Sequence, residues 1–216
     1  MIKIGSARID ENGCISGGRA GDQTGREVCE EPFYVHQYGW NVLRCTNDIV
    51  RKHLADCMKQ ACKNNNIGYD QNQRLGIISK GIWTDEPTEC DCSSLVRACL
   101  LECGIEIANF TTYNEKKLVM DTGMFQCFEY VNGMDLCMGD ILVSKKKGHT
   151  AIVTEGVDYT DDWEDTGEVY NIDDLAKRCI RGEFGNGATR KQKLERMQKG
   201  LYKKVQARIN EIFRGL

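Results

Sequence analysis

The sequence predicts an α+β fold in which a larger mixed unit is followed by a smaller helical one. Short runs rich in β-branched residues, such as 141–143 and 150–154, indicate strands, whereas the apolar residues between 47 and 64 recur at helical spacing. From about residue 171 onward only helical spacing remains. We therefore expect a domain over residues 1–156, an acidic linker over 157–171 and a small three-helix module over 172–216.

The larger unit is expected to contain strands at its N-terminus and three helices. Residues 4–9 alternate in polarity and residues 40–44 are typical of a strand. Asn47 or Thr46 can cap the helix over 47–64, and a shorter helix is expected over 114–120. The third helix is expected to begin at Cys92 and to end near Gly104.

The cysteine content is high, with 12 cysteines in 216 residues. The first residues contain no long apolar stretch, which indicates synthesis in a reducing cytosol and disfavours disulfides. Cys90 and Cys92 are separated by a single residue, which does not match the spacing of structural zinc sites. We therefore expect no metal and no cofactor. Most other cysteines fall on amphipathic helical faces and are interpreted as small buried residues, among them Cys57, Cys62, Cys99 and Cys103.

Cys92 and His149 are the candidate catalytic pair. Asp91 is a suitable N-cap, so Cys92 would lie at a helix start, where N–H groups and the helix dipole favour a thiolate. His149 directly precedes the run 150–154 and would open a strand, as one of only 3 histidines. A neutral imidazole is a suitable general base for a thiol. The alternative is that both residues only pack in the core.

These residues carry a resemblance to a known family. Asp91-Cys92-Ser93-Ser94-Leu95-Val96, with Gly139-Asp140-Ile141-Leu142-Val143 and Gly148-His149-Thr150-Ala151-Ile152-Val153, resembles the NlpC-type papain-like cell-wall hydrolases. The resemblance covers about residues 41–156 and includes bacteriophage peptidoglycan amidases and endopeptidases. It implies a papain-like domain, with an antiparallel sheet and packed helices, that hydrolyses an amide of the peptidoglycan stem peptide through a Cys-His pair.

The same resemblance implies further site residues. The segment Asn66-Ile67-Gly68-Tyr69 is similar to a Gly-x-Pro-Tyr element of that family, without its proline. Tyr69 would then lie beside the nucleophile, and Asp91 and Ser93 would line the substrate pocket. A muramoyl–L-alanine amidase is favoured. Cleavage at γ-D-glutamyl–diamino-acid bonds or cross-bridges by an endopeptidase of the same family is the alternative.

The third catalytic residue is not found where the family places it. Residues 157–168 contain six acids and are typical of a solvated linker rather than the next strand. We expect the N-terminal strands to replace the missing one, as in a permuted fold. Asp22 or Gln23 would then orient His149 through its second ring nitrogen. The alternative is that both lie in an ordered surface loop, and His36 is a weaker candidate for the same role.

The C-terminal module is strongly basic. Residues 172–216 carry 12 Lys and Arg against 5 Asp and Glu, which predicts an anionic partner. The pattern from Leu175 to Asn210 resembles the wall-binding repeat of a pneumococcal phage lysozyme. That resemblance implies contacts to the wall's disaccharide-peptide unit from Phe184, Gly185, Asn186, Gly187 and Arg190. One copy predicts weak affinity unless the module also self-associates.

The two resemblances together predict a bacteriophage endolysin. Its partner would be bacterial peptidoglycan, with no nucleic acid and no stable membrane insertion. In the absence of a signal peptide it would accumulate in the cytoplasm of the infected bacterium and act on the wall after release. Two alternatives of another class are a wall-binding protein with an inactive catalytic half and an intracellular cysteine acyltransferase.

Overall fold

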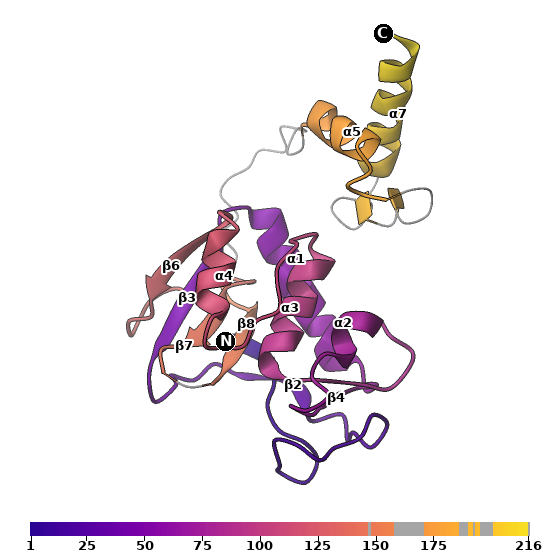
Figure 1. Cartoon of the computed structure of the whole chain (residues 1–216). Helices are drawn as coiled ribbons and strands as arrows, with labels where there is room; N and C mark the ends of the chain where they lie inside the picture. Colours follow the sequence, from indigo (N-terminus) through magenta and orange to yellow (C-terminus); the bar gives the residue numbers. More distant parts are fainter. Residues whose placement is uncertain (147, 158–170, 186–189, 192, 195–200, 216) are drawn as a thin grey trace. The chain divides into compact units, whose positions relative to one another are not determined.

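The computed structural model describes residues 1–146, 148–157, 171–185, 190–191, 193–194 and 201–215. The chain divides into two compact units, Met1–Tyr159 and Thr160–Leu216. The first combines a mainly antiparallel sheet with helices, and the described part of the second is helical (Figure 1). The predicted α+β class is therefore confirmed. Nearly all of the expected acidic linker lies outside the described residues.

The larger unit is built on a six-stranded sheet with the order β2-β1-β8-β7-β3-β6. All of its strand pairs are antiparallel. A separate pair, β4 and β5, is parallel and leads into the candidate site. The strands are β1 Lys3–Ala7, β2 Val28–Pro32, β3 Trp40–Cys45, β4 Ile67–Tyr69, β5 Thr88–Cys90, β6 Phe125–Glu129, β7 Ile141–Ser144 and β8 Thr150–Glu155.

The N-terminal strand lies where the sequence predicted that a strand was missing. β1 pairs with β8, the strand that follows His149, with Ile4 opposite Val153 and Gly5 opposite Ile152. β2 pairs with the other edge of β1. A Cβ atom at Gly5 would come within 2.5 Å of the Met58 side chain, so glycine allows a helix to pack closely on this strand. The N-terminal block, by which we mean residues 4–44, is therefore an integral part of the sheet.

Four helices belong to this unit: α1 Asp48–Lys63, α2 Gly76–Lys80, α3 Cys92–Glu102 and α4 Glu115–Asp121. The side chain of Asn47 accepts hydrogen bonds from the N–H groups of Ile49 and Val50, which confirms the predicted cap of α1. α1 and α3 both pack against β1 and β8, and α4 packs against β3 and β6 (Figure 1). The helices thus cover one face of the sheet.

Both faces of the sheet are apolar because its strands alternate. Ile141, Val143 and Ile152 belong to the core under the helices, whereas Leu142 and Ala151 belong to a second cluster on the opposite face. That second cluster contains Trp40 and is flanked by aromatic residues of the segment after β2. Among the described residues, no helix has the length and apolar composition needed to cross a bilayer.

The C-terminal unit has its own small core. Its described helices are α5 Ile172–Ile180, capped by the Asn171 side chain, and α7 Leu201–Arg214. Of the three helices predicted for this module, the middle one falls largely outside the described residues, although Arg190, Lys191, Lys193 and Leu194 are helical. The buried side chains that form the core are Leu175, Ala176, Cys179, Phe184, Leu194, Leu201, Val205 and Ile209.

Candidate active site

Cys92 is the first residue of α3, directly after β5. Asp91 has an extended backbone and caps the helix, with its side chain accepting from Ser94 N at 2.6 Å. The Ser94 hydroxyl in turn accepts from Asp91 N at 2.8 Å, which completes a capping box. The turn between strand and helix therefore fixes the backbone of Cys92, as the sequence predicted.

The protonation state of Cys92 differs from the expectation. The residue is only 8% exposed, and burial, followed by the charges of Asp91 and Glu115, raises the pKa of its thiol to about 12. The N–H groups of Thr150 and Ser93 act in the opposite direction. The predicted low pKa is wrong for this unliganded state, because desolvation of the charged form outweighs the favourable N–H groups. At neutral pH the thiol carries its proton.

His149 directly precedes β8, and the strand before it in the chain, β7, ends at Ser144. The backbone of His149 exchanges two hydrogen bonds with Ser144, and its ring lies 6.1 Å from that of Trp40. Burial, with added contributions from the charges of Arg8 and His36, lowers the pKa of His149 to about 4. Its Nε2 is buried and has no hydrogen-bond partner within the described part of the chain. The imidazole is therefore neutral, with one buried ring nitrogen that makes no hydrogen bond to the described residues.

The packing of α3 against β8 brings the start of β8, which follows His149, close to Cys92. The backbone N–H of Thr150, the residue after His149, acts directly on the thiol of Cys92. A cavity of about 390 Å³ opens beside the imidazole and is lined by Arg8, Tyr34, Val35, His36, Gln37 and His149. Burial raises the pKa of Tyr34, and the Cys92 thiol contributes to the rise, so this tyrosine lies near both groups. The N-terminal block thus forms a wall of the cavity.

Tyr69 lies on β4 and is buried near the thiol. Its backbone N–H donates to Glu27 Oε2 at 2.7 Å, and its hydroxyl accepts from Gln71 at 3.1 Å. Burial raises the pKa of Tyr69 to about 12, and Cys92 is among the charges that add to the rise. The phenol is therefore neutral and keeps its proton for donation.

Arg74 was not predicted from the sequence, yet it joins two predicted site residues. Its guanidinium donates to Asp91 at 2.5 Å, to Ser93 Oγ at 2.9 Å and to the Phe110 carbonyl at 2.5 Å. The Ser93 hydroxyl also donates to Asp91. Asp91 and Ser93 are thus held mainly by protein partners beside Cys92. An arginine just before a short helix carries no sequence signal that would reveal this role.

Glu115 is a second residue that the sequence did not reveal. It begins α4, is fully buried and accepts a hydrogen bond from the Thr150 hydroxyl at 2.7 Å. Burial raises the pKa of Glu115 to about 8, and its second oxygen has no partner among the described residues. The protonated carboxyl group of Glu115 therefore contacts Thr150, whose backbone N–H acts on the thiol of Cys92. An acidic residue in the first turn of a helix is usually exposed, so the sequence gave no reason to expect that Glu115 is buried.

Asp22 and Gln23 have partners within the N-terminal loop. The Asp22 carboxylate accepts from Arg19 N at 2.9 Å, and the Gln23 amide donates to the Asn66 carbonyl at 2.7 Å. The Gln23 bond attaches the loop to the residue before β4, whereas the Asp22 bond lies within the loop. Of the three residues considered for orienting His149, His36 lines the cavity beside that imidazole, whereas Asp22 and Gln23 are not among the residues that line it.

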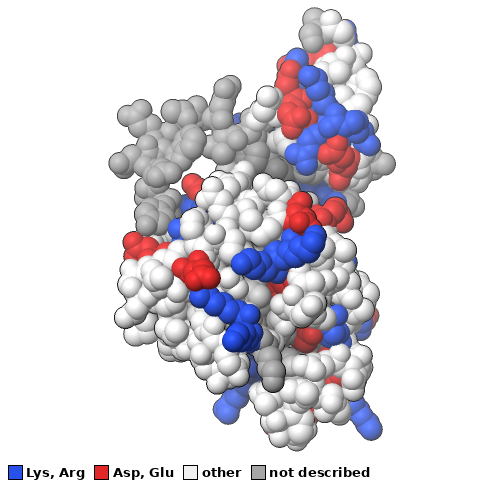
Figure 2. Space-filling view, turned by 60° about the vertical axis from the view of Figure 1, so that its left-hand side comes forward, with Lys and Arg blue, Asp and Glu red and all other residues white. Residues whose placement is uncertain are grey.

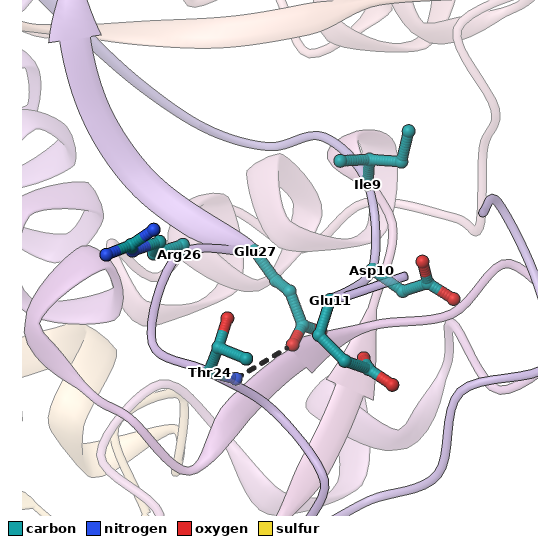
Figure 3. A pocket seen from close by; sticks show the side chains of 6 residues that line it. All are labelled: Ile9, Asp10, Glu11, Thr24, Arg26 and Glu27. Carbon is teal, nitrogen blue, oxygen red and sulfur yellow. Dashed lines mark hydrogen bonds between the residues drawn. The ribbon is translucent and has the colours of Figure 1, made fainter. Parts of the chain in front are cut away.

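A second cavity, of about 470 Å³, is lined by Ile9, Asp10, Glu11, Thr24, Arg26 and Glu27 (Figure 3). Its acidic side chains come from two loops of the N-terminal block. Glu27 is buried, and its Oε1 accepts from Thr24 N at 3.1 Å while its Oε2 accepts from Tyr69 N. The Glu27 side chain, which lines this cavity, therefore connects the N-terminal block to the backbone of Tyr69.

The predicted wall-binding residues fall partly within the described chain. Phe184 is 8% exposed and packs in the core, with the Arg178 guanidinium 5.1 Å from its ring centre. Arg190 donates to the carbonyls of Gly185 and Cys179, which holds the loop against α5. Asn186 and Gly187 lie outside the described residues.

The basic residues of the C-terminal unit are partly paired. On the face drawn in Figure 2, its Lys and Arg side chains lie among Asp and Glu side chains rather than forming one unbroken basic patch. Arg178 pairs with Glu183, and Arg208 pairs with Asp173 and Glu211. These ion pairs leave the net positive charge of the unit unchanged.

Comparison with known families agrees with this architecture. A family model described as an endolysin-like domain matches residues 4–159, and the chain belongs to that family. A second model, the CW_7 repeat, matches residues 173–213 in the C-terminal unit. The two matches support a phage cell-wall lytic enzyme that carries a separate cell-wall repeat. Comparisons with curated proteins and with solved structures give no match.

Proposed function

We propose that the chain is a cysteine-dependent peptidoglycan hydrolase of papain-like design that cleaves an amide of the stem peptide. The observation that carries the proposal is that Thr150, the residue after His149, acts through its backbone N–H on the thiol of Cys92 at the start of a buried helix. The Nε2 of His149 is itself buried and lacks a partner among the described residues. A buried nitrogen without a partner is costly in a resting protein. It is explained if a reactant supplies the missing hydrogen bond.

The reaction begins from an uncharged thiol and an uncharged imidazole. His149 takes the Cys92 proton as Sγ attacks the amide carbon, and it then delivers that proton to the leaving amine. The Cys92 N–H at the helix start and the Tyr69 hydroxyl stabilise the oxyanion. Water then attacks the thioester, with His149 again accepting a proton, and the free thiol and a carboxylate result. This route needs no resident ion pair.

The bond we favour is N-acetylmuramoyl–L-alanine, and cleavage of a γ-D-glutamyl–diamino-acid or cross-bridge amide is the alternative. The third catalytic residue is Asp22 or Gln23 by the permutation argument, or His36 because its ring lines the same cavity as His149. The CW_7 repeat supports docking on peptidoglycan, with Gly185 and Arg190 among the proposed contact residues.

The test is digestion of purified cell wall followed by mass spectrometry of the soluble muropeptides. Release of stem peptides with a free L-alanine amine supports the amidase, and new D-glutamate or cross-bridge termini support an endopeptidase. The Cys92→Ala variant should release neither. If the variant digests the wall as fast as the native chain, the proposal is wrong. Transfer of an acyl group to an amine without net hydrolysis would instead favour the acyltransferase.

A further inference from the structure

Helices α1 and α3 bring together a group of metal-ligand side chains far from the proposed active site. His53 and Cys57 lie on α1, and Cys103 is the C-cap residue of α3. A ring nitrogen of His53 and the two sulfur atoms all lie within 4.8 Å of one another. The two helices pack against each other. The cluster therefore joins segments about 46 residues apart in sequence.

The geometry of this group suits a tetrahedral metal ion. His53 and Cys57 are four residues apart, so they project from the same face of α1. Zinc bonds of about 2.0–2.3 Å place neighbouring ligand atoms roughly 3.5 Å apart. Rotations of the side chains that move each ligand atom by less than about 1 Å would bring the three atoms to that spacing. Soft thiolates with one imidazole are a ligand set that selects zinc.

The two thiols of the cluster are hydrogen-bonded to each other, an interaction that lowers the pKa of Cys57 and raises the pKa of Cys103. Cys57 is buried, whereas His53 and Cys103 are partly exposed. An ion can therefore enter from the surface, and a water molecule can complete its coordination. Cys99, one turn before Cys103 on α3, is also close enough to interact electrostatically with Cys57.

We propose that His53, Cys57 and Cys103 bind one zinc ion that fastens the C-terminal end of α3 to α1. Cys92 begins the same helix at its other end. The ion would therefore hold the helix whose start positions the proposed nucleophile, without contacting the reacting atoms. The site is structural, so its main effect is on the free energy of unfolding. It is independent of the proposed hydrolase activity.

The test uses the full chain with Cys92→Ala, so that the proposed catalytic thiol cannot bind metal. Reduced, chelator-treated protein is titrated with Co²⁺ and then with Zn²⁺. We expect one Co²⁺ per chain, a sulfur-to-cobalt charge-transfer band and its loss when Zn²⁺ displaces the cobalt. Zn²⁺ should also raise the Tm, because an ion that binds only the folded state stabilises it.

The ligand variants are Cys103→Ser and His53→Gln, which change partly exposed residues and so spare the core. Each should weaken Co²⁺ binding by at least about 100-fold and abolish the Zn²⁺-dependent rise in Tm. The matched control is Cys137→Ser, which removes a buried cysteine outside the cluster. The control should bind metal as the parent does.

Three results would overturn the proposal. One is the absence of a cobalt–thiolate band in the reduced parent protein. Another is an unchanged band and affinity in both ligand variants. The third is a Cys57–Cys103 disulfide, found by peptide mass spectrometry, in protein that binds no metal after reduction. That last result would identify the pair as a redox couple instead.

Discussion

The hydroxyl of Thr150 donates a 2.7 Å hydrogen bond to Oε1 of Glu115, and the backbone N–H of the same threonine acts on the Cys92 thiol. Thr150 therefore links the first residue of α4 to the first residue of α3. The charge of Glu115 raises the pKa of Cys92. The protonation state of a fully buried carboxyl group is thus coupled to the proposed nucleophile.

Glu115→Gln should change how stability depends on pH. The folded-state pKa of Glu115 is raised to about 8 from a usual 4.5. Between these values the unfolded chain loses a proton that the folded chain keeps, so this group makes the free energy of unfolding fall as pH rises. The variant lacks that effect. Its Tm relative to the native chain should rise between about pH 5 and pH 8, by an amount that corresponds to roughly 1–3 kcal/mol.

Thermal unfolding followed by circular dichroism at several pH values measures this difference. Glu106→Gln, which changes an exposed glutamate, is the control and should show a pH dependence parallel to that of the native chain. Parallel curves for Glu115→Gln as well would show that the buried carboxyl is ionised at neutral pH.

Cys92→Ala should abolish wall lysis, whereas Cys90→Ala should retain it. Cys90 is fully buried, and its thiol donates to the Gly68 carbonyl at 3.3 Å. Removal of the thiol costs packing and one weak hydrogen bond, so we expect the free energy of unfolding to fall by about 1 kcal/mol or less, with a modest fall in Tm. Turbidity of a wall suspension and thermal unfolding measure the two effects. Equal loss of lysis from both folded variants would assign the activity to the cysteine pair rather than to Cys92.

The protonation states of the catalytic pair predict an unusual pH profile. Because the pKa of His149 is lowered to about 4, its imidazole stays neutral across the mildly acid range. Cleavage of soluble muropeptides should therefore remain near its maximum until the pH approaches 4. Iodoacetamide should label Cys92 slowly at pH 7, since the pKa of its thiol is about 12. Exposed Cys14 provides the internal comparison in the same peptide map.

Rapid labelling of Cys92 with an apparent pKa below 7 would contradict this picture. It would show that a thiolate–imidazolium pair exists before substrate binds. An acid limb near pH 6.5 would instead show that the imidazole of His149 keeps its ordinary pKa.

Deletion of residues 1–30 should unfold the larger unit rather than shorten a tail. β1 is an interior strand between β2 and β8, so its loss leaves β8 with an unpaired edge and uncovers Ile4's neighbours in the core. Circular dichroism and protease sensitivity measure the outcome. A deleted chain that stays folded with native Tm would show that the strands after His149 are supplied in another way.

The orienting residue is tested by single substitutions in the same block. His36→Ala, Asp22→Ala and Gln23→Ala are compared for kcat and Tm on a soluble muropeptide. Loss of the orienting group should lower kcat by about a hundredfold with little change in Tm. A substitution that only breaks the Gln23–Asn66 bond should lower Tm and leave kcat unchanged. A native kcat in all three variants would exclude these candidates.

Removal of residues 172–216 should weaken binding to intact walls but preserve cleavage of soluble muropeptides. The C-terminal unit has its own core and is a separate compact unit. Sedimentation with insoluble wall measures binding, and the muropeptide assay serves as the control for folding of the remaining unit. Loss of small-substrate cleavage in a folded truncated chain would place part of the C-terminal unit in the active site.

Local patterns were sufficient for much of the fold. Asn47 and Asp91 cap helices as their side chains predict, because capping depends on neighbours within a few residues. Alternation in residues 4–9 and the lack of a strand-like pattern in the sequence of residues 157–168 together predicted that the N-terminal strands complete the sheet beside the strand after His149, and β1 pairs with β8. Both family resemblances also rested on residues that are close in sequence.

What the sequence determined by itself was therefore the order of the elements, the positions of Cys92 and His149 at a helix start and a strand end, and the two families. Only the tertiary structure decided the electrostatics, because desolvation depends on what packs around a group. The tertiary structure buries Cys92 and His149 enough to keep both uncharged. It also forms the hydrogen bond between Thr150 and Glu115 and the ion pair between Arg74 and Asp91. It also brought His53, Cys57 and Cys103 together from two helices. Each of these contacts joins segments distant in the chain, so no local spacing could predict it.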